Sequence, residues 1–297
     1  MRGVLVVDVG NTTTKLGLFD ADAGTPCGAA VGTSAPCGPG GASPVGTLSI
    51  TTHTRYTADE ARMAVVQALG IWGVPAPAGA VLACVVPALS DVWRAALAAA
   101  CTGRVMVVGP GLKSGIRMRY DDPAEVGADR VADIVAARAD YGAPVVVVDL
   151  GTTTNFEVVD AGGAFVGGII APGLALGAHS LASAAARLPE VELRAPERVI
   201  GKNTRAAMQS GVVLGEVARI DGLLKAIMDE LGVDGAAGAD AGSAAAWGAG
   251  AEAAEVAVVI TGTQAAWLAG LLHHETVADE TLTLRGLYYL WCRNARK

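Results

Sequence analysis

Two stretches of the chain share one pattern of apolar and polar positions. In the first, the apolar run Val4–Val7 leads into Asp8, a glycine and small hydroxyl residues, and a second apolar run, Leu16–Phe19, follows. The same order recurs where Val145–Val148 leads into Asp149, a glycine and three threonines. Each stretch is typical of a strand, a tight turn and a second strand. The repeat, about half a chain apart, predicts two related domains that each open with an acid-bearing hairpin.

Strands and helices alternate along the rest of the chain, which predicts an α/β fold. Thr57 and Glu60 have the spacing of a capping box at a helix start. Further strands are expected at 47–50, 81–86, 105–108, 164–170 and 256–260. Helices are expected from Thr57, over 90–101, after Pro123, over 172–185, over 203–231, from about residue 265, and after Leu282–Leu284 at the end of the chain. We expect a domain of residues 1–125 and a domain of residues 126–297, facing each other across a cleft, with loops at 21–46 and 233–254.

Composition narrows the possible partners and the compartment. The chain has 297 residues, 52% of them apolar, and a net charge of −7 without any basic run. We therefore expect neither nucleic acid nor an acidic membrane surface as a partner. We expect no signal peptide, and the sequence contains no apolar stretch of membrane-spanning length, so a cytoplasmic protein is expected. Five cysteines, an odd number without metal-site spacing, are expected to be reduced thiols, and His273 and His274 a solvated surface pair.

The first hairpin carries groups that suit the phosphates of a nucleotide. Gly10 lets the backbone turn sharply and approach a ligand closely. Thr12, Thr13 and Thr14 offer hydroxyls and backbone N–H groups to phosphate oxygens. Asp8 can hold a magnesium ion, directly or through water. The stretch is therefore a candidate phosphate cradle.

A third stretch, residues 119–130, places a carboxylate and a guanidinium group at the start of a helix. Asp129 and Arg130 fall in the first turn, where the helix dipole and free N–H groups favour anions such as a carboxylate. Arg130 can clamp such a group, and Asp129 can accept a proton from a substrate hydroxyl. Acids are also common in first turns for structural reasons alone, and the spacing by itself leaves that alternative open.

Several motifs, in order along nearly the whole chain, resemble those of the type III pantothenate kinases. They are Asp8-Val9-Gly10-Asn11-Thr12, Glu125-Val126-Gly127-Ala128-Asp129-Arg130, Asp149-Leu150-Gly151-Thr152, Ile200-Gly201-Lys202-Asn203-Thr204, and Leu282-Thr283-Leu284-Arg285-Gly286-Leu287. The first hairpin alone would indicate only the broad superfamily of acetate and sugar kinases, Hsp70 and actin. The resemblance implies two ribonuclease-H-like domains with ATP between them. It also implies transfer of the γ-phosphoryl group of ATP to the primary hydroxyl of pantothenate, the first step of coenzyme A synthesis.

The resemblance assigns a role to each matching residue. Asp129 would be the general base, and Asp149 would bind a monovalent cation, potassium or ammonium. Magnesium would accompany the nucleotide, and Thr204 would contact pantothenate across the interface of a homodimer. The residues expected to bind ATP are Asp8, Val9, Gly10, Asn11, Thr12, Thr13, Thr14, Lys15 and Thr152. Those expected to bind pantothenate are Tyr120, Gly127, Ala128, Asp129, Arg130 and Thr204.

The sequence departs from the family pattern at two sites that bear on function. The family has Thr-Gly-Gly near the adenosine, where this chain has Thr261-Gly262-Thr263. It has Thr-Phe-Asp at the end of the second hairpin, where this chain has Asn155-Phe156-Glu157. The first departure keeps a second hypothesis open, a paralogue of low activity that binds pantothenate or nucleotide as a regulatory or partner subunit. A third hypothesis is a kinase of another small hydroxylated acid.

Overall fold

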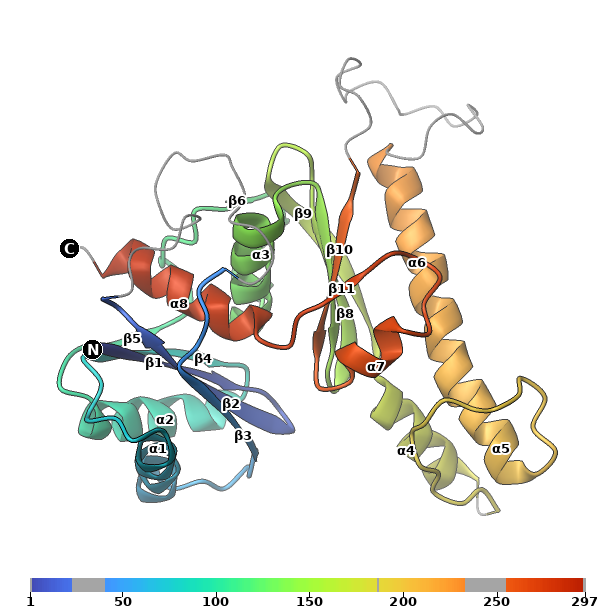
Figure 1. The fold of residues 1–297 in the computed structure, drawn as a ribbon, viewed down its shortest axis with the longest axis horizontal. Helices are drawn as coiled ribbons and strands as arrows, with labels where there is room; N and C mark the ends of the chain where they lie inside the picture. Colours follow the sequence, from blue (N-terminus) through green and yellow to red (C-terminus); the bar gives the residue numbers. More distant parts are fainter. Residues whose placement is uncertain (1, 23–40, 186, 233–254, 296–297) are drawn as a thin grey trace. The chain divides into compact units, whose positions relative to one another are not determined.

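The computed structural model describes residues 2–22, 41–185, 187–232 and 255–295. Most of both expected loops, together with Cys27, Cys37 and Trp247, lies outside these residues. The strands are β1 Gly3–Val9, β2 Thr13–Asp20, β3 Gly46–Thr51, β4 Gly79–Cys84, β5 Val105–Val107, β6 Arg117–Met118, β7 Val145–Leu150, β8 Thr153–Val159, β9 Ala164–Pro172, β10 Ala257–Gly262 and β11 Val277–Ala278. The α-helices are α1 Ala58–Trp72, α2 Pro87–Ala100, α3 Ala128–Tyr141, α4 Leu174–Ala184, α5 Thr204–Gln209, α6 Gly215–Leu231, α7 Ala265–Ala269 and α8 Leu282–Asn294 (Figure 1).

The described residues form two compact units, each with its own sheet. Unit 1 comprises Met1–Gly142, Gly163–Gly167 and Asp279–Lys297, and unit 2 comprises Ala143–Gly162 and Gly168–Ala278. The α/β class and the presence of two sheets confirm the prediction from the alternating pattern. The boundary expected between residues 125 and 126 stays a prediction about where the two halves of the repeat meet.

The two sheets repeat one strand order. In unit 1 the order is β3-β2-β1-β4-β5, and the second sheet runs β9-β8-β7-β10-β11, with β6 added beyond β9. In both, a central strand pairs antiparallel with the next strand in sequence and parallel with the strand after a helical crossover. Asp8 and Asp149 occupy equivalent positions, one residue before the end of the two central strands. The structure thus confirms the repeat that the apolar pattern predicted.

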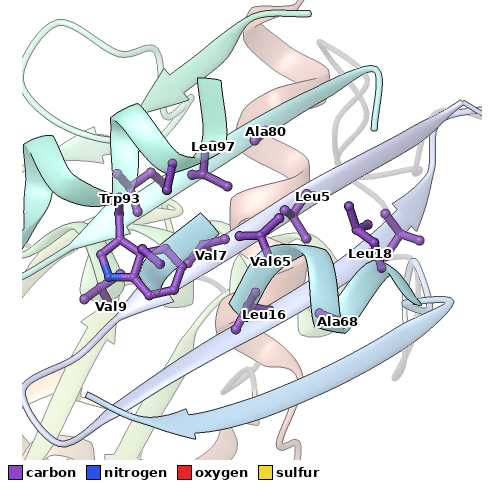
Figure 2. Packing of buried hydrophobic residues seen from close by; sticks show 14 of the residues in the cluster. Leu5, Val7, Val9, Leu16, Leu18, Val65, Ala68, Ala80, Trp93 and Leu97 are labelled. Atoms are coloured by element: carbon purple, nitrogen blue, oxygen red, sulfur yellow. The ribbon is translucent and has the colours of Figure 1, made fainter. Parts of the chain in front are cut away.

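Alternation along β1 divides its side chains between the two faces of the sheet. Leu5, Val7 and Val9 point into a core shared with Val65 of α1 and Trp93 of α2 (Figure 2). Since successive strand residues point to opposite faces, Val4, Val6 and Asp8 lie on the other face. That face is covered by α8, which contacts β1, β2 and β4 and packs along α3. Asp8 therefore lies on the same face of the sheet as α3.

The motif at the end of the chain joins α8 to α3. Arg285 is 2% exposed and donates to Asp140 Oδ2 (2.8 Å) and Asp279 Oδ1 (2.8 Å). Tyr289 donates to the other oxygen of Asp140 (2.6 Å). The residue after Arg285 in α8 is Gly286. It lies so close to α3 that a Cβ there would be 1.9 Å from the carbonyl oxygen of Ala132. The motif thus holds α3 in place through buried charge and close backbone contact.

Several elements differ from the sequence prediction. The capping box at Thr57 and Glu60 is confirmed, but α2 begins at Pro87 rather than near residue 90. The helix expected over 203–231 contains a π-turn, Ser210–Leu214, which separates α5 from α6. The last helix already includes Leu282–Leu284, and the short strands β6 and β11 had no apolar pattern long enough to predict them.

The histidine pair lies at the surface as predicted, with the His273 side chain 88% exposed and that of His274 26% exposed, but both rings also contact an acid. Nδ1 of His273 and Nδ1 of His274 lie 2.8 and 2.9 Å from the two carboxylate oxygens of Asp221 in α6. The backbone N–H groups of both histidines also donate to this carboxylate. This contact could not be predicted from the local pattern, because Asp221 lies some fifty residues away along the chain. Among the described residues, the three cysteines are reduced thiols, as expected.

Candidate active site

The first hairpin presents its turn at the carboxyl end of β1. Asp8 is 8% exposed and lies beside Cys84, where β4 ends. Burial raises the pKa of the Cys84 thiol, and the charge of Asp8 raises it further, so the thiol stays neutral beside the acid. The turn closes through a bond from Gly10 N–H to Thr13 O (3.0 Å). Asn11 and Thr12 are exposed at its tip, where their polar groups can meet a ligand.

The side of the hairpin is braced by Thr52. Its N–H donates to Thr12 O (2.9 Å), and its hydroxyl lies 2.8 Å from that of Thr14. Thr14 is fully buried, so its hydroxyl is directed into the protein. The accessible part of the candidate cradle is therefore the turn Gly10–Thr13 together with Lys15, which is partly exposed.

The start of α3 lies at the same edge of the sheet of unit 1. Val85, the residue after β4, donates its N–H to Val9 O (3.1 Å), which places it next to the hairpin. A Cβ at Gly127 would lie 3.7 Å from Val85 Cγ1. The structure therefore brings the Asp8 hairpin and the Gly127–Arg130 stretch to the carboxyl ends of two neighbouring strands. Ligands of open α/β sheets bind at this kind of edge.

Gly127 leaves room for the carboxylate of Asp129. Asp129 is partly exposed, and its Oδ1 accepts a hydrogen bond from the N–H of Arg130 (2.8 Å). A Cβ at Gly127 would lie only 2.5 Å from this Oδ1. Any side chain at 127 would therefore displace the carboxylate. The bond to Arg130 is ordinary first-turn chemistry, and it also fixes the orientation of the acid.

Arg130 and Tyr120 share one aromatic neighbour. Arg130 is 7% exposed, and its guanidinium carbon lies 5.7 Å from the ring centre of Phe165. Tyr120 stacks on the same ring, with ring centres 5.6 Å apart and planes at 25°. Phe165 was not singled out from the sequence, where it is only one apolar position in an expected strand.

In unit 2, Asp149 lies in a row of oxygen-bearing side chains. It pairs with Asn155 on β8 and with Thr261 on β10, so all three side chains point to one face. Oδ1 of Asn155 and Oγ1 of Thr261 are buried, and neither has a hydrogen-bond partner among the described residues. The row therefore offers unsatisfied oxygen ligands beside a carboxylate.

Two glycines enclose the turn that carries Thr152. Gly173 donates its N–H to Thr152 O (3.1 Å), and a Cβ there would lie 2.6 Å from the same oxygen. Gly262 has φ = +99°, and a Cβ there would lie 2.3 Å from Leu150 O. Only glycine fits at 262, because the backbone is left-handed and packed against the turn. A cavity of ≈ 210 Å³ adjoins Gly173 and is lined on its other side by Glu216 and Arg219.

The sequence comparisons agree with this arrangement. The profile of a family described as type III pantothenate kinase matches residues 4–226. A type III pantothenate kinase of Brevibacillus brevis is 33% identical over 297 residues, covering 98% of this chain and 99% of that protein. One of Acidobacterium capsulatum is 40% identical over 243 residues, covering 81% and 82%.

The chain belongs to the type III pantothenate kinase family.

Comparison with solved structures supports the fold of this type III pantothenate kinase family member. A Campylobacter jejuni protein described as a Baf family transcriptional activator has a TM-score of 0.51 at 17% identity and covers 99% of this chain and 100% of its own. A Sinorhizobium meliloti protein described as a 2-dehydro-3-deoxygalactonokinase has a TM-score of 0.50 at 12% identity, covering 99% and 97%. At such identities the likeness shows the fold alone.

The residues present can be compared with the two cations that the sequence resemblance implies, magnesium and a monovalent ion. In the described parts of the chain, no group of three or more His, Cys, Asp or Glu side chains is arranged so that it could hold a metal ion. Magnesium bound with a nucleotide needs no such cage, because phosphates and water supply most of its ligands, and Asp8 would add one carboxylate. The row of Asp149, Asn155 and Thr261 has the hard oxygen ligands that suit a potassium or ammonium ion.

The remaining expected residues of this family member lie in unit 2 and are accessible. Thr204 is exposed in the first turn of α5, where Asn203 caps the helix by accepting from Ala206 N–H (2.9 Å). Thr263, at the position where the resemblance led us to expect glycine, is exposed directly after Gly262. No helix within the described residues has the length and apolar character needed to cross a membrane.

Proposed function

We propose that this chain is an active pantothenate kinase, which transfers the γ-phosphoryl group of ATP to the primary hydroxyl of pantothenate. The observation that carries the proposal is the meeting of the Asp8 hairpin and the Gly127–Arg130 stretch at one sheet edge in unit 1. One supplies backbone N–H groups and an acid for phosphates, and the other supplies a base and a cation for a hydroxylated acid. Membership of the family names the two substrates.

The proposed chemistry needs positioning and charge neutralisation more than covalent steps. The turn Gly10–Thr13 and Lys15 would hold the ATP phosphates, and Thr152 would also contact ATP. Magnesium, when bound with the nucleotide, supplies positive charge to the transferring group. Asp8 would bind it directly or through water. Asp149 would hold a monovalent cation, potassium or ammonium.

The substrate side of the reaction is assigned to α3 and its neighbours. Asp129 would accept the proton of the pantothenate hydroxyl, and the first turn of α3 with Arg130 would hold the pantothenate carboxylate. Tyr120, Gly127 and Ala128 would line the same side. We further propose a cytoplasmic homodimer in which Thr204 of one subunit contacts pantothenate bound to the other.

The proposal is tested by ADP release from the purified chain with ATP, magnesium and pantothenate, with and without potassium. Pantothenate-dependent turnover that rises with potassium is expected. The matched variant for the cation is Asp149→Asn, which keeps the shape of the side chain but removes its charge, and its turnover should lose the dependence on potassium. No turnover by the wild-type chain, with pantothenate binding still detected by calorimetry, would overturn the proposal.

A further inference from the structure

Phe165 lies in a strand segment that unit 1 holds firmly. It is fully buried near the start of β9, and its carbonyl accepts a hydrogen bond from Arg119 N–H (2.8 Å). Met118 of β6 is its partner in the ladder. The turn before it is packed on α3, because a Cβ at Gly163 would lie 2.6 Å from Nε of Arg138. The ring of Phe165 is therefore a fixed surface rather than a mobile one.

Two side chains of different origin rest on this ring. Tyr120 comes from the segment that follows β6, and Arg130 comes from the first turn of α3. The Tyr120 ring stacks at 5.6 Å, and the Arg130 guanidinium carbon lies 5.7 Å from the ring centre. An aromatic ring attracts a guanidinium through its quadrupole and another ring through offset stacking. One buried ring thus orients both groups at once.

Arginine needs such support more than most side chains do. Its stem has several rotatable bonds, while a two-point contact with a carboxylate requires the guanidinium plane to be fixed. An aliphatic side chain at 165 could fill the space but would present no π face to set that plane. The aromatic character of Phe165 is therefore expected to matter beyond its contribution to the core.

We propose that Phe165 is a positioning residue for substrate binding, which holds Arg130 and Tyr120 in the orientation that receives the carboxylate end of pantothenate. The inference rests on the proposed function, because only there are Arg130 and Tyr120 substrate ligands. Phe165 acts through these two side chains and touches neither reacting group.

The test is steady-state kinetics of Phe165→Leu with pantothenate and ATP varied separately. KM for pantothenate is expected to rise about tenfold. This corresponds to the binding free energy lost with one cation–π contact and one stacking contact. The kcat and KM for ATP should change less than about twofold, because Asp129 and the phosphate hairpin are untouched. Phe165→Met, which is unbranched and adapts to the space, replaces Phe165→Leu if the latter does not fold.

A matched control separates positioning from general loosening of the core. Phe156→Leu makes the same change at another fully buried phenylalanine, on β8 in unit 2. It should lower the melting temperature to a similar degree and leave KM for pantothenate unchanged. An equal rise in KM in this control would overturn the inference.

A double-mutant cycle tests whether Phe165 acts through Arg130. Arg130→Lys removes the planar guanidinium, so adding Phe165→Leu to it should raise KM less than about threefold further. If the two substitutions raise KM for pantothenate by fully additive amounts, this inference is overturned. It is also overturned if Phe165→Leu alone leaves KM unchanged while the wild type is active. Neither result bears on the proposed function. A wild-type chain that does not phosphorylate pantothenate overturns the proposed function and this inference with it.

Discussion

At the scale of single residues, the site depends on where one carboxylate can lie. Asp129 is held by the N–H of the next residue, in space that exists because residue 127 has no side chain. The sequence identified Asp129 and Gly127 as members of one motif. The structure gives the physical reason for their spacing, because the Asp129 carboxylate occupies the space that a Cβ at residue 127 would need.

Asp129→Asn is expected to reduce kcat by about 10²- to 10⁴-fold, because an amide cannot accept the substrate proton. Circular dichroism and the melting temperature should stay close to those of the wild type, since an amide oxygen can still accept from Arg130 N–H. Asp91→Asn, at an exposed acid of α2, is the control and should retain full activity. Near-normal turnover of a folded Asp129→Asn chain would rule out the role as base.

Gly127→Ala is expected to lower kcat about 10- to 100-fold by displacing the Asp129 carboxylate. The backbone at 127, φ −56° and ψ 149°, is open to alanine, so stability should change by less than about 1 kcal/mol. Gly70→Ala, in α1, has nothing within 4 Å of the new methyl group and should stabilise the chain by about 0.5–1 kcal/mol with full activity. Equal activity in the two variants would show that the space at 127 is not needed.

At the scale of elements, α3 is positioned by its contacts with α8 rather than by its own sequence. The two helices meet where Gly286 lies against Ala132, and buried Arg285 joins Asp140 to Asp279. Asp129, the proposed base, lies at one end of α3, and this ion-pair network lies at the other. A substitution in α8 that alters this packing is therefore expected to shift the residues at the start of α3.

Gly286→Ala is expected to destabilise the chain by about 1–3 kcal/mol, because the methyl group would push α8 away from the backbone of α3. Urea unfolding followed by circular dichroism measures the loss. The same substitution at Gly222 in α6 meets nothing within 4 Å and should be neutral or stabilising. If both variants unfold at the same urea concentration, the close contact between Gly286 and α3 does not contribute to stability.

Asp221 gives α6 a pH-dependent tie to the segment after α7. Burial raises the pKa of its carboxyl, but hydrogen bonds from His274 and His273 outweigh this and hold the pKa below its usual value. A lowered folded-state pKa adds stability above the unfolded value of about 3.9, and this stability is lost as pH falls through the folded value.

Asp221→Asn should therefore be less stable than the wild type at neutral pH, and the difference should shrink as pH falls below about 4. Denaturant unfolding at a series of pH values measures it. Asp229→Asn, at the exposed end of the same helix, should differ little from the wild type at any pH. A difference for Asp221→Asn that stays constant down to the lowest pH would contradict the titration of this carboxyl.

At the scale of the whole molecule, the residues named in the proposed function are divided between the two units, and the proposed dimer adds Thr204 of a second subunit. Asp8 and Asp129 belong to unit 1, whereas Asp149, Thr152 and Thr204 belong to unit 2. Thr204 is exposed at the start of α5, as a residue that reaches a neighbouring chain must be. The proposed dimer makes the assembly itself testable.

Asp129→Asn and Thr204→Val chains are each expected to be nearly inactive and to regain activity when mixed and allowed to exchange subunits. Mixed dimers would contain one site with both Asp129 and Thr204, which gives roughly a quarter of wild-type turnover. Light scattering should show dimers before and after mixing. A fully active monomer, or no recovery in chains shown to exchange, would contradict the contact across the interface.

Local patterns in the sequence determined the repeat, the hairpins and the start of α3, because strand alternation, turn residues and helix caps act over a few neighbouring residues. The two acid-bearing strands and the capping box at Thr57 could be read directly. Two short strands were not predicted, because β6 and β11 have two residues each and form only through pairing with a neighbouring strand.

Only the tertiary structure decided which distant residues meet. Phe165 joins Tyr120 to Arg130, Arg285 joins α8 to α3, and Asp221 binds two histidines some fifty residues away. Such contacts leave no periodic signal, because they depend on packing between elements rather than on the order of residues within one. The sequence by itself determined the chemistry available to this protein, and the fold determined which of those groups act together.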